Sequence, residues 1–134
     1  MALTRYLLDT NHAGTLLDQR ATLWDRLGTI DRKQLGLCRP SVGELYFMVF
    51  NSSRAKANRI RLESLLRQLA IWEFDAKAAI EFGRLRAELR ASGQPIPTFD
   101  VMIAAIARVN RLVLLSADKH FAAVDGLSVE NWLQ

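Results

Sequence analysis

The sequence predicts an α/β fold in which a central parallel sheet of four to five strands carries helices on both faces. Short runs rich in leucine, valine and isoleucine alternate with longer segments whose apolar residues recur at the helical period. Strands that are buried on both faces have such continuous apolar runs. Half of the 134 residues are apolar and no stretch resembles a linker or a repeat, so we expect one domain over residues 1–134.

The first half of the chain is expected to supply two strands and three helices. Apolar runs that stop at polar residues predict the strands, and apolar residues three or four positions apart predict the helices. In chain order these elements are the strand Tyr6–Leu8, a helix over 16–27 that stops at Gly28, a strand over 34–38 ended by Pro40, a helix from Ser41, and a helix over 58–69 with Ile60, Leu62, Leu65, Leu66 and Leu69 facing inward.

The second half is expected to supply up to three strands and two helices. Asp75 has the position of an N-cap for a long helix through Leu89 that Gly93 closes. Two prolines make the segment "QPIPTFD" (94–100) a rigid loop, because proline interrupts helices. The remaining elements are a possible strand over 70–74, a buried helix over 101–109, a strand over 112–116 and a last strand over 127–132.

Composition narrows the location and the partners. The net charge of +4 favours polyanionic partners. The arginine and lysine clusters could equally be solvated helix faces. The lone Cys38 lies in an apolar run and is expected to be a buried thiol in a reducing cytosol. Because the sequence offers no leader peptide and no membrane-spanning segment, we expect a cytoplasmic protein without a membrane partner. The two basic clusters are Arg54, Lys56, Arg59, Arg61 and Arg67 in one segment, and Arg84, Arg86 and Arg90 in another.

Four acids fall where strands give way to helices: Asp9, Glu44, Asp100 and Asp118. The carboxyl ends of parallel strands form the ligand crevice of open α/β sheets, so these acids are expected to converge. Each also has a local alternative. Glu44 could close a capping box with Ser41, and Asp100 and Asp118 could be N-caps or first-turn acids that favour the helix dipole.

Converging carboxylates repel one another and raise one another's pKa unless a cation lies between them. Mg²⁺ or Mn²⁺ suits such an oxygen-only site and leaves room for a phosphate. A basic surface around an acidic metal site suits a nucleic-acid substrate. Glycine-rich phosphate loops, Cys/His metal spacing and a nucleophile elbow are not found. His120 is expected near Asp118 in a surface or supporting role.

Several motifs in order resemble the signature blocks of PIN-domain ribonucleases of the VapC toxin type. These blocks are "LLDTN", "SVGEL", "PIPTFDVMIAAIA", "LLSADKHF" and "GLSVENW", and they extend over almost the whole chain. The resemblance implies a PIN-like three-layer sandwich, a Mg²⁺- or Mn²⁺-dependent endoribonuclease acting on RNA, a homodimer, and a VapB-type antitoxin as protein partner. It also assigns the catalytic, metal-binding acids to Asp9, Glu44, Asp100 and Asp118, with Thr10, Asn11 and Ser116 in support.

The chain departs from the family pattern at two places, since "TFD" precedes the third acid differently and His12-Ala13-Gly14 stands where apolar residues are frequent. Two alternatives stay open. One is a non-catalytic nucleic-acid or protein-binding module that keeps the fold. The other is an aspartate-based Mg²⁺ phosphotransfer domain, although a phosphatase of that kind would carry a second aspartate where this chain has Asn11.

An exposed groove is expected for the protein partner. The helix from Ser41 carries Tyr46, Phe47, Val49 and Phe50, and only about half of these can face the sheet at the helical period. With the apolar stripe of the helix over 58–69, the others would form a groove flanked by basic residues, which suits an amphipathic helix with an acidic flank. The alternative is that the two helices simply pack on each other.

Overall fold

The structure is a computed structural model that describes residues 3–17, 25, 28 and 30–133. The five short strands make one parallel sheet in the order β3-β2-β1-β4-β5. The predicted parallel α/β fold is therefore confirmed. The strands are β1 (Tyr6–Leu8), β2 (Leu35–Cys38), β3 (Ala70–Trp72), β4 (Val113–Leu115) and β5 (Val129–Glu130).

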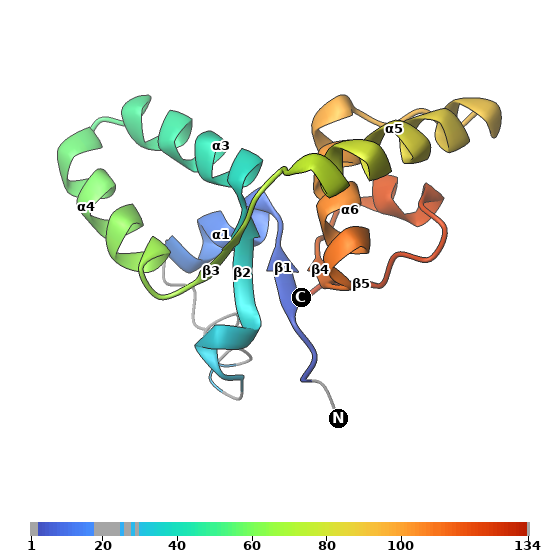
Figure 1. The fold of residues 1–134 in the computed structure, drawn as a ribbon. Helices are drawn as coiled ribbons and strands as arrows, with labels where there is room; N and C mark the ends of the chain where they lie inside the picture. Colours follow the sequence, from blue (N-terminus) through green and yellow to red (C-terminus); the bar gives the residue numbers. More distant parts are fainter. Residues whose placement is uncertain (1–2, 18–24, 26–27, 29, 134) are drawn as a thin grey trace.

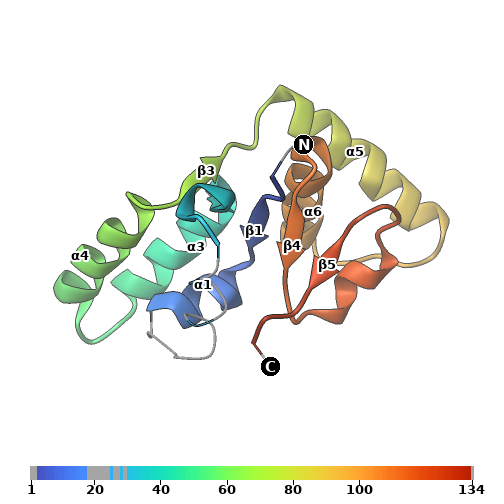
Figure 2. The same cartoon turned by 90° about the horizontal axis from the view of Figure 1, so that it is seen from below.

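Helices cover both faces of the sheet (Figure 1). On one side lie α1 (Thr10–Leu17), α3 (Arg39–Phe50) and α4 (Ala55–Leu66), and on the other lie α5 (Ala76–Ala91) and α6 (Thr98–Asn110). Figure 2 shows the same separation from below, with β3 and β5 toward opposite edges. Two 3₁₀ helices, η1 (Arg32–Gln34) and η2 (Lys119–Ala123), complete the described elements.

Adjacent residues of β1 pack into two separate hydrophobic cores. Leu7 packs with the apolar residues of α5 and α6, whereas Leu8 packs with those of α1, α3 and α4. This follows from the alternation of side chains along a strand. Both leucines are fully buried, so the central strand has no solvent-facing side.

The strand order also marks the ligand crevice. From β1 the chain moves outward through β2 and β3, then crosses back so that β4 lies on the other side of β1. In open α/β sheets such a reversal opens a crevice at the carboxyl ends of the strands. Here that crevice lies where β1 and β4 end, next to Asp9 and Ser116.

Some boundaries differ from those predicted. The helix α3 begins at Arg39, so Pro40 opens the helix instead of merely ending the strand. The helix α6 begins at Thr98, within the segment expected to be a loop, and Pro97 is its N-cap. Prolines are tolerated in both places because the first helical turn leaves its N–H groups unpaired. The helix expected over 16–27 falls mostly outside the described residues, but α1 already begins at Thr10.

The inward face of α4 is narrower than predicted. Leu62 and Leu65 are buried, but Ile60 is 63% exposed. Residues two positions apart point to nearly opposite sides of a helix, so Ile60 cannot share the face of Leu62. The predicted inward position of Ile60 is therefore wrong.

Other expectations are confirmed. The Asp75 carboxylate accepts a hydrogen bond from the Ala78 N–H (3.0 Å), as an N-cap does. Gly93 follows α5 with φ at +70°. Cys38 is a buried free thiol, and burial raises its pKa. No helix in the described parts of the chain has the length and apolar character to cross a membrane.

Candidate active site

The four predicted acids line one pocket. Asp9, Glu44, Asp100 and Asp118 surround a cavity of about 430 Å³ at the carboxyl edge of the sheet. Its wall is otherwise formed by both polar and apolar side chains: Thr10, Asn11, Met48, Phe99, Ile103 and Phe121. We call this cavity the acid pocket. The four carboxylates therefore converge on one cavity, as predicted.

Asp9 is held on the buried side of the acid pocket. Its N–H donates to the Leu115 carbonyl (3.0 Å), which fixes it between the ends of β1 and β4. Its Oδ1 atom accepts hydrogen bonds from the backbone N–H of His12 (2.7 Å) and lies 3.1 Å from His12 Nδ1. Only 6% of Asp9 is exposed, so contacts within the protein orient this carboxylate.

Asp100 and Asp118 face each other across the more open side. Asp100 lies in the first turn of α6, and Asp118 caps η2 by accepting from the His120 N–H (2.9 Å). The ring of His120 joins them, since its Nδ1 lies 3.2 Å from Asp100 Oδ2 and 3.1 Å from Asp118 Oδ1. These three residues offer ligand atoms within 4.8 Å of one another. His120 therefore lies next to Asp118, as expected.

The pKa of Asp100 is raised above its ordinary value by the surroundings of this carboxyl in the acid pocket. Burial raises this pKa most, and the negative charges of Asp118 and Asp9 raise it further. The hydrogen bond from His120 acts in the opposite direction. Ionised Asp100 is thus destabilised by its neighbours, which is the situation that a divalent cation among the carboxylates would relieve. The oxygen donors here fit a hard cation such as Mg²⁺ or Mn²⁺.

Glu44 reaches the acid pocket from the second turn of α3, because that helix begins at Arg39. The alternative capping box between Ser41 and Glu44 is wrong, since Cys38 is the N-cap. Ser41 is fully buried instead, and its hydroxyl lies 3.4 Å from Thr10 Oγ1 and 3.3 Å from Cys38 Sγ. Ser41 therefore ties the start of α1 to the start of α3.

The predicted supporting residues lie beside the acids. Thr10 bonds Ser41, and Asn11 lines the acid pocket from the first turn of α1. The buried Ser116 hydroxyl accepts from the Asp118 N–H (3.0 Å), which orders the turn between β4 and η2. Asp118 is an N-cap as well as a pocket residue, so the capping alternative holds for it alongside the convergence.

One residue next to the acids, His12, was not predicted as a site residue from the sequence. His12 is completely buried and contacts Asp9 through its ring and its backbone. The sequence spacing could have predicted this contact, because Asp9 and His12 are three residues apart and would be neighbours if α1 began at Thr10. The helix was expected to begin later, and this contact was missed for that reason.

The chain is similar to proteins of known family and structure. The chain matches the PIN domain family over residues 6–127. It is 33% identical to "Ribonuclease VapC2" of Haemophilus influenzae over 96% of this chain and 98% of the relative. It is 28% identical to the "tRNA(fMet)-specific endonuclease VapC" of Shigella flexneri over 96% and 98% of the two chains.

Among solved structures, one similar fold is VapBC2 from Rickettsia felis, bound to a DNA fragment from its promoter. The two chains superpose with a TM-score of 0.89 at 26% identity, covering 96% of this chain and 99% of the other. The five-stranded parallel sheet between two helical layers is thus the PIN-like sandwich implied by the resemblance. By these matches the chain belongs to the PIN domain family, among its VapC-type ribonucleases.

Proposed function

We propose that the chain is an endoribonuclease toxin of a type II toxin–antitoxin system, which hydrolyses RNA phosphodiester bonds at the acid pocket with Mg²⁺ or Mn²⁺. The observation that carries this proposal is the convergence of Asp9, Glu44, Asp100 and Asp118 on one cavity. Relatives named as ribonucleases and as a tRNA(fMet)-specific endonuclease support RNA as the substrate class.

The four acids share one part in this proposal. Asp9, Asp100, Asp118 and Glu44 would hold the cation, with the buried Asp9 as its fixed point. When bound, such a cation lowers the pKa of water and stabilises the charge on a phosphodiester. Thr10, Asn11 and Ser116 would keep the acids in register, because they order the turns that carry them. Together the acids would orient the RNA phosphate at the carboxyl edge.

Several arginines of the basic surface already contact other groups of the protein. Arg59 pairs with Glu63, Arg61 donates to the Leu17 carbonyl, and Arg84 pairs with Glu81. Arg86 and Arg90 line a separate hollow of about 300 Å³ with Thr98 and Val101 of α6, and the Arg86 guanidinium also lies over the Phe82 ring at 6.0 Å. We propose Arg86 and Arg90, two basic residues of α5, as contacts for RNA phosphates outside the acid pocket.

The test is a cleavage assay with labelled RNA in Mg²⁺, in Mn²⁺ and in EDTA. Cutting is expected with either cation and is expected to stop in EDTA. Undiminished cutting in chelator would overturn the metal dependence. RNA binding without cleavage would favour the non-catalytic module, and a phosphorylated aspartate after incubation with acetyl phosphate would favour the phosphotransfer domain. The Asp100→Asn variant is the matched control against a contaminating nuclease.

The proposed protein partner is an antitoxin of the VapB type, because the similar Rickettsia felis structure is a VapBC complex. Apolar side chains are exposed on the face formed by α3 and α4. Phe47 and Phe50 are 63% and 61% exposed, and Ile60 lies on the neighbouring helix. The helices do pack on each other, with the Tyr46 hydroxyl donating to Glu63 (2.8 Å), and Val49 is buried. Phe47 and Ile60 remain outside that contact, whereas Phe50 takes part in it, since Arg59 of α4 lies over its ring at 5.6 Å, but Phe50 stays largely exposed.

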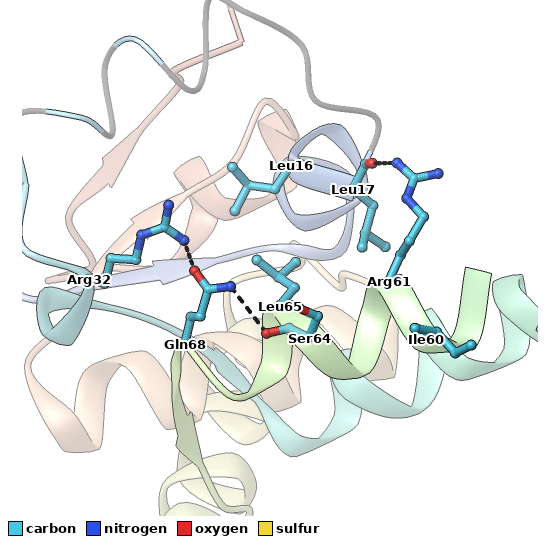
Figure 3. A pocket seen from close by; sticks show the side chains of 8 residues that line it. All are labelled: Leu16, Leu17, Arg32, Ile60, Arg61, Ser64, Leu65 and Gln68. Atoms are coloured by element: carbon cyan, nitrogen blue, oxygen red, sulfur yellow. Dashed lines mark hydrogen bonds between the residues drawn. The ribbon is translucent and has the colours of Figure 1, made fainter. Parts of the chain in front are cut away.

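A hollow lies beside α4 on the side of α1, and of the three exposed residues only Ile60 lines it (Figure 3). This cavity of about 370 Å³ has apolar side chains from both helices along its wall, and Arg61 and Arg32 stand at its two ends. Arg61 donates to the Leu17 carbonyl and Arg32 to the Gln68 side chain. An amphipathic helix with acidic flanks fits an apolar wall that ends in arginines. The apolar residues are Leu16, Leu17, Ile60 and Leu65.

Co-purification with the product of the neighbouring small reading frame tests this partner. Phe47→Glu, Phe50→Glu and Ile60→Glu are expected to weaken the complex while ribonuclease activity is retained. Ile80→Glu is the matched control, because Ile80 is 64% exposed on α5 in the opposite helical layer. A complex that is unaffected by all three changes would rule out this face. Normal growth of cells expressing the lone, active chain would count against a toxin.

Two further expectations stay predictions. We propose a homodimer, as the family resemblance implies, and sedimentation equilibrium of the purified chain measures it. A cytoplasmic location is expected of an enzyme whose substrate is cellular RNA. Fractionation of cells that express the chain with its partner would test that location.

A further inference from the structure

The imidazole of His12 has a hydrogen-bond partner at each ring nitrogen. Its Nε2 accepts from the backbone N–H of Trp132 (3.1 Å), and its Nδ1 lies 3.1 Å from Asp9 Oδ1. A backbone N–H can only donate, so Nε2 must be the bare nitrogen. The proton of the neutral ring is then on Nδ1, where it is donated to Asp9. His12 is completely buried, so water does not compete for either contact.

Both of the hydrogen bonds from His12 to Asp9 are accepted by the same carboxylate oxygen. Oδ1 receives both the His12 backbone N–H and the Nδ1–H, whereas no donor in the described part of the chain contacts Oδ2. Asp9 itself lines the acid pocket. The carboxylate is thereby fixed in rotation about its last bond, and Oδ2 keeps its lone pairs for a ligand in the pocket.

We propose that His12 is a positioning residue of the metal site, which holds Asp9 in the orientation that binds the cation and is itself aligned by the C-terminal segment. This inference rests on the proposed metal-dependent function. Trp132 supplies the alignment, since its ring is buried, packs against Tyr6 with ring centroids 5.0 Å apart, and donates to Glu130. The segment after β5 thus contacts the first acid, Asp9, indirectly through the His12 imidazole.

A purely structural role would predict different behaviour. If His12 served only as the acceptor for the Trp132 N–H, every substitution that removes this acceptor would have the same effect on Mn²⁺ affinity. Two variants separate the roles. His12→Asn keeps an N–H near the position of Nδ1 and loses the acceptor for Trp132, whereas His12→Leu loses both. Removing groups that orient a metal ligand typically weakens metal affinity by about 10- to 100-fold.

Calorimetric titration with Mn²⁺ is the decisive measurement, with thermal unfolding in EDTA alongside. His12→Leu is expected to raise the Kd for Mn²⁺ by about 10- to 100-fold, and His12→Asn by much less. Both are expected to lower Tm, because both leave the Trp132 N–H without its His12 acceptor. Equal losses of affinity in the two variants, or none in His12→Leu, would overturn the inference.

The wild-type protein supplies two further readings. If it binds no Mn²⁺, the proposed metal site fails, which is distinct from variants that bind as well as wild type. Nitrogen-15 NMR of the wild-type histidines needs no variant to fold. A protonated Nδ1 and a bare Nε2 at His12 are expected, and the opposite tautomer would overturn the positioning role.

Discussion

Two histidine–carboxylate contacts border the same pocket with almost the same geometry and opposite surroundings. His12 lies 3.1 Å from Asp9, and His120 lies 3.1 to 3.2 Å from Asp118 and Asp100. The His12 side chain is fully buried, whereas that of His120 is 51% exposed. His12 is also held at its second nitrogen, but Nε2 of His120 has no protein partner within the described residues.

The difference divides the acid pocket into a fixed half and an adjustable half. Asp9 is oriented by contacts that water cannot replace, so its position is set before any ligand arrives. Asp100 and Asp118 share an exposed histidine, and that contact competes with solvent. In the proposed metal site, a cation would displace the exposed His120 contact more easily than the buried contact that holds Asp9. A preorganised carboxylate on one side and an exchangeable histidine contact on the other suit a site that must both bind and release its ligands.

The largest expected effect is on catalysis, and it should not distinguish the halves. Asp9→Asn and Asp100→Asn each remove one negative charge from the acid pocket. Each is expected to lower the cleavage rate by roughly 10²-fold or more, as when a charge-stabilising group is lost. Rates with labelled RNA in Mg²⁺ measure it, and circular dichroism checks the fold. If either variant cuts at the wild-type rate, that acid is not part of the reaction.

Stability should separate the two halves. Asp9→Ala leaves the His12 N–H and Nδ1–H unpaired in the interior, which is expected to cost about 1–3 kcal/mol. Asp100→Ala is expected to be neutral or stabilising in metal-free protein, because it removes a carboxylate that its neighbours disfavour. Urea unfolding in EDTA compares them. Asp9→Asn is the matched control, since the amide oxygen can still accept from His12. Equal losses for both alanine variants would remove the distinction.

A smaller effect is expected from pH. Asp100 has a raised pKa in the folded protein, so the folded state binds more protons than the unfolded state just above the ordinary pKa of aspartate. Metal-free stability should therefore decline as pH rises from that value through the raised pKa of Asp100. The Asp100→Asn variant should lose this contribution. Chemical unfolding in EDTA at several pH values measures it, and an unchanged slope in the variant would contradict the assignment.

The sequence predicted the acids better than their environments. Asp9, Asp100 and Asp118 adjoin strand ends or helix starts, and in a parallel sheet that position alone determines which edge they share. The prolines were less informative, because a proline ends a helix in its interior and opens one in its first turn. Both Pro40 and Pro97 proved to stand at helix starts, which extended α3 and α6 toward the N-terminus.

The role of His12 could not be read from the chain alone. Its contact with Asp9 is local, but the contact that fixes its tautomer comes from Trp132, 120 residues away. Such a pairing depends on how the C-terminal segment returns to α1, and no periodicity encodes it. The exposed Ile60 is a simpler case, since counting positions from Leu62 would have placed it on the outer face.

The smallest expected effect concerns His120. Because its side chain is half exposed, His120→Ala should change the stability of metal-free protein by no more than about 0.5 kcal/mol, in contrast to His12→Leu. The pKa of Asp100 should rise further, because the hydrogen bond from His120 lowers it in the wild type while burial and the charges of Asp118 and Asp9 raise it. Carbon-13 NMR of the Asp100 carboxyl in EDTA follows this pKa directly. An unchanged pKa would mean that His120 does not hold Asp100 in solution, and the adjustable half would then consist of the two acids alone.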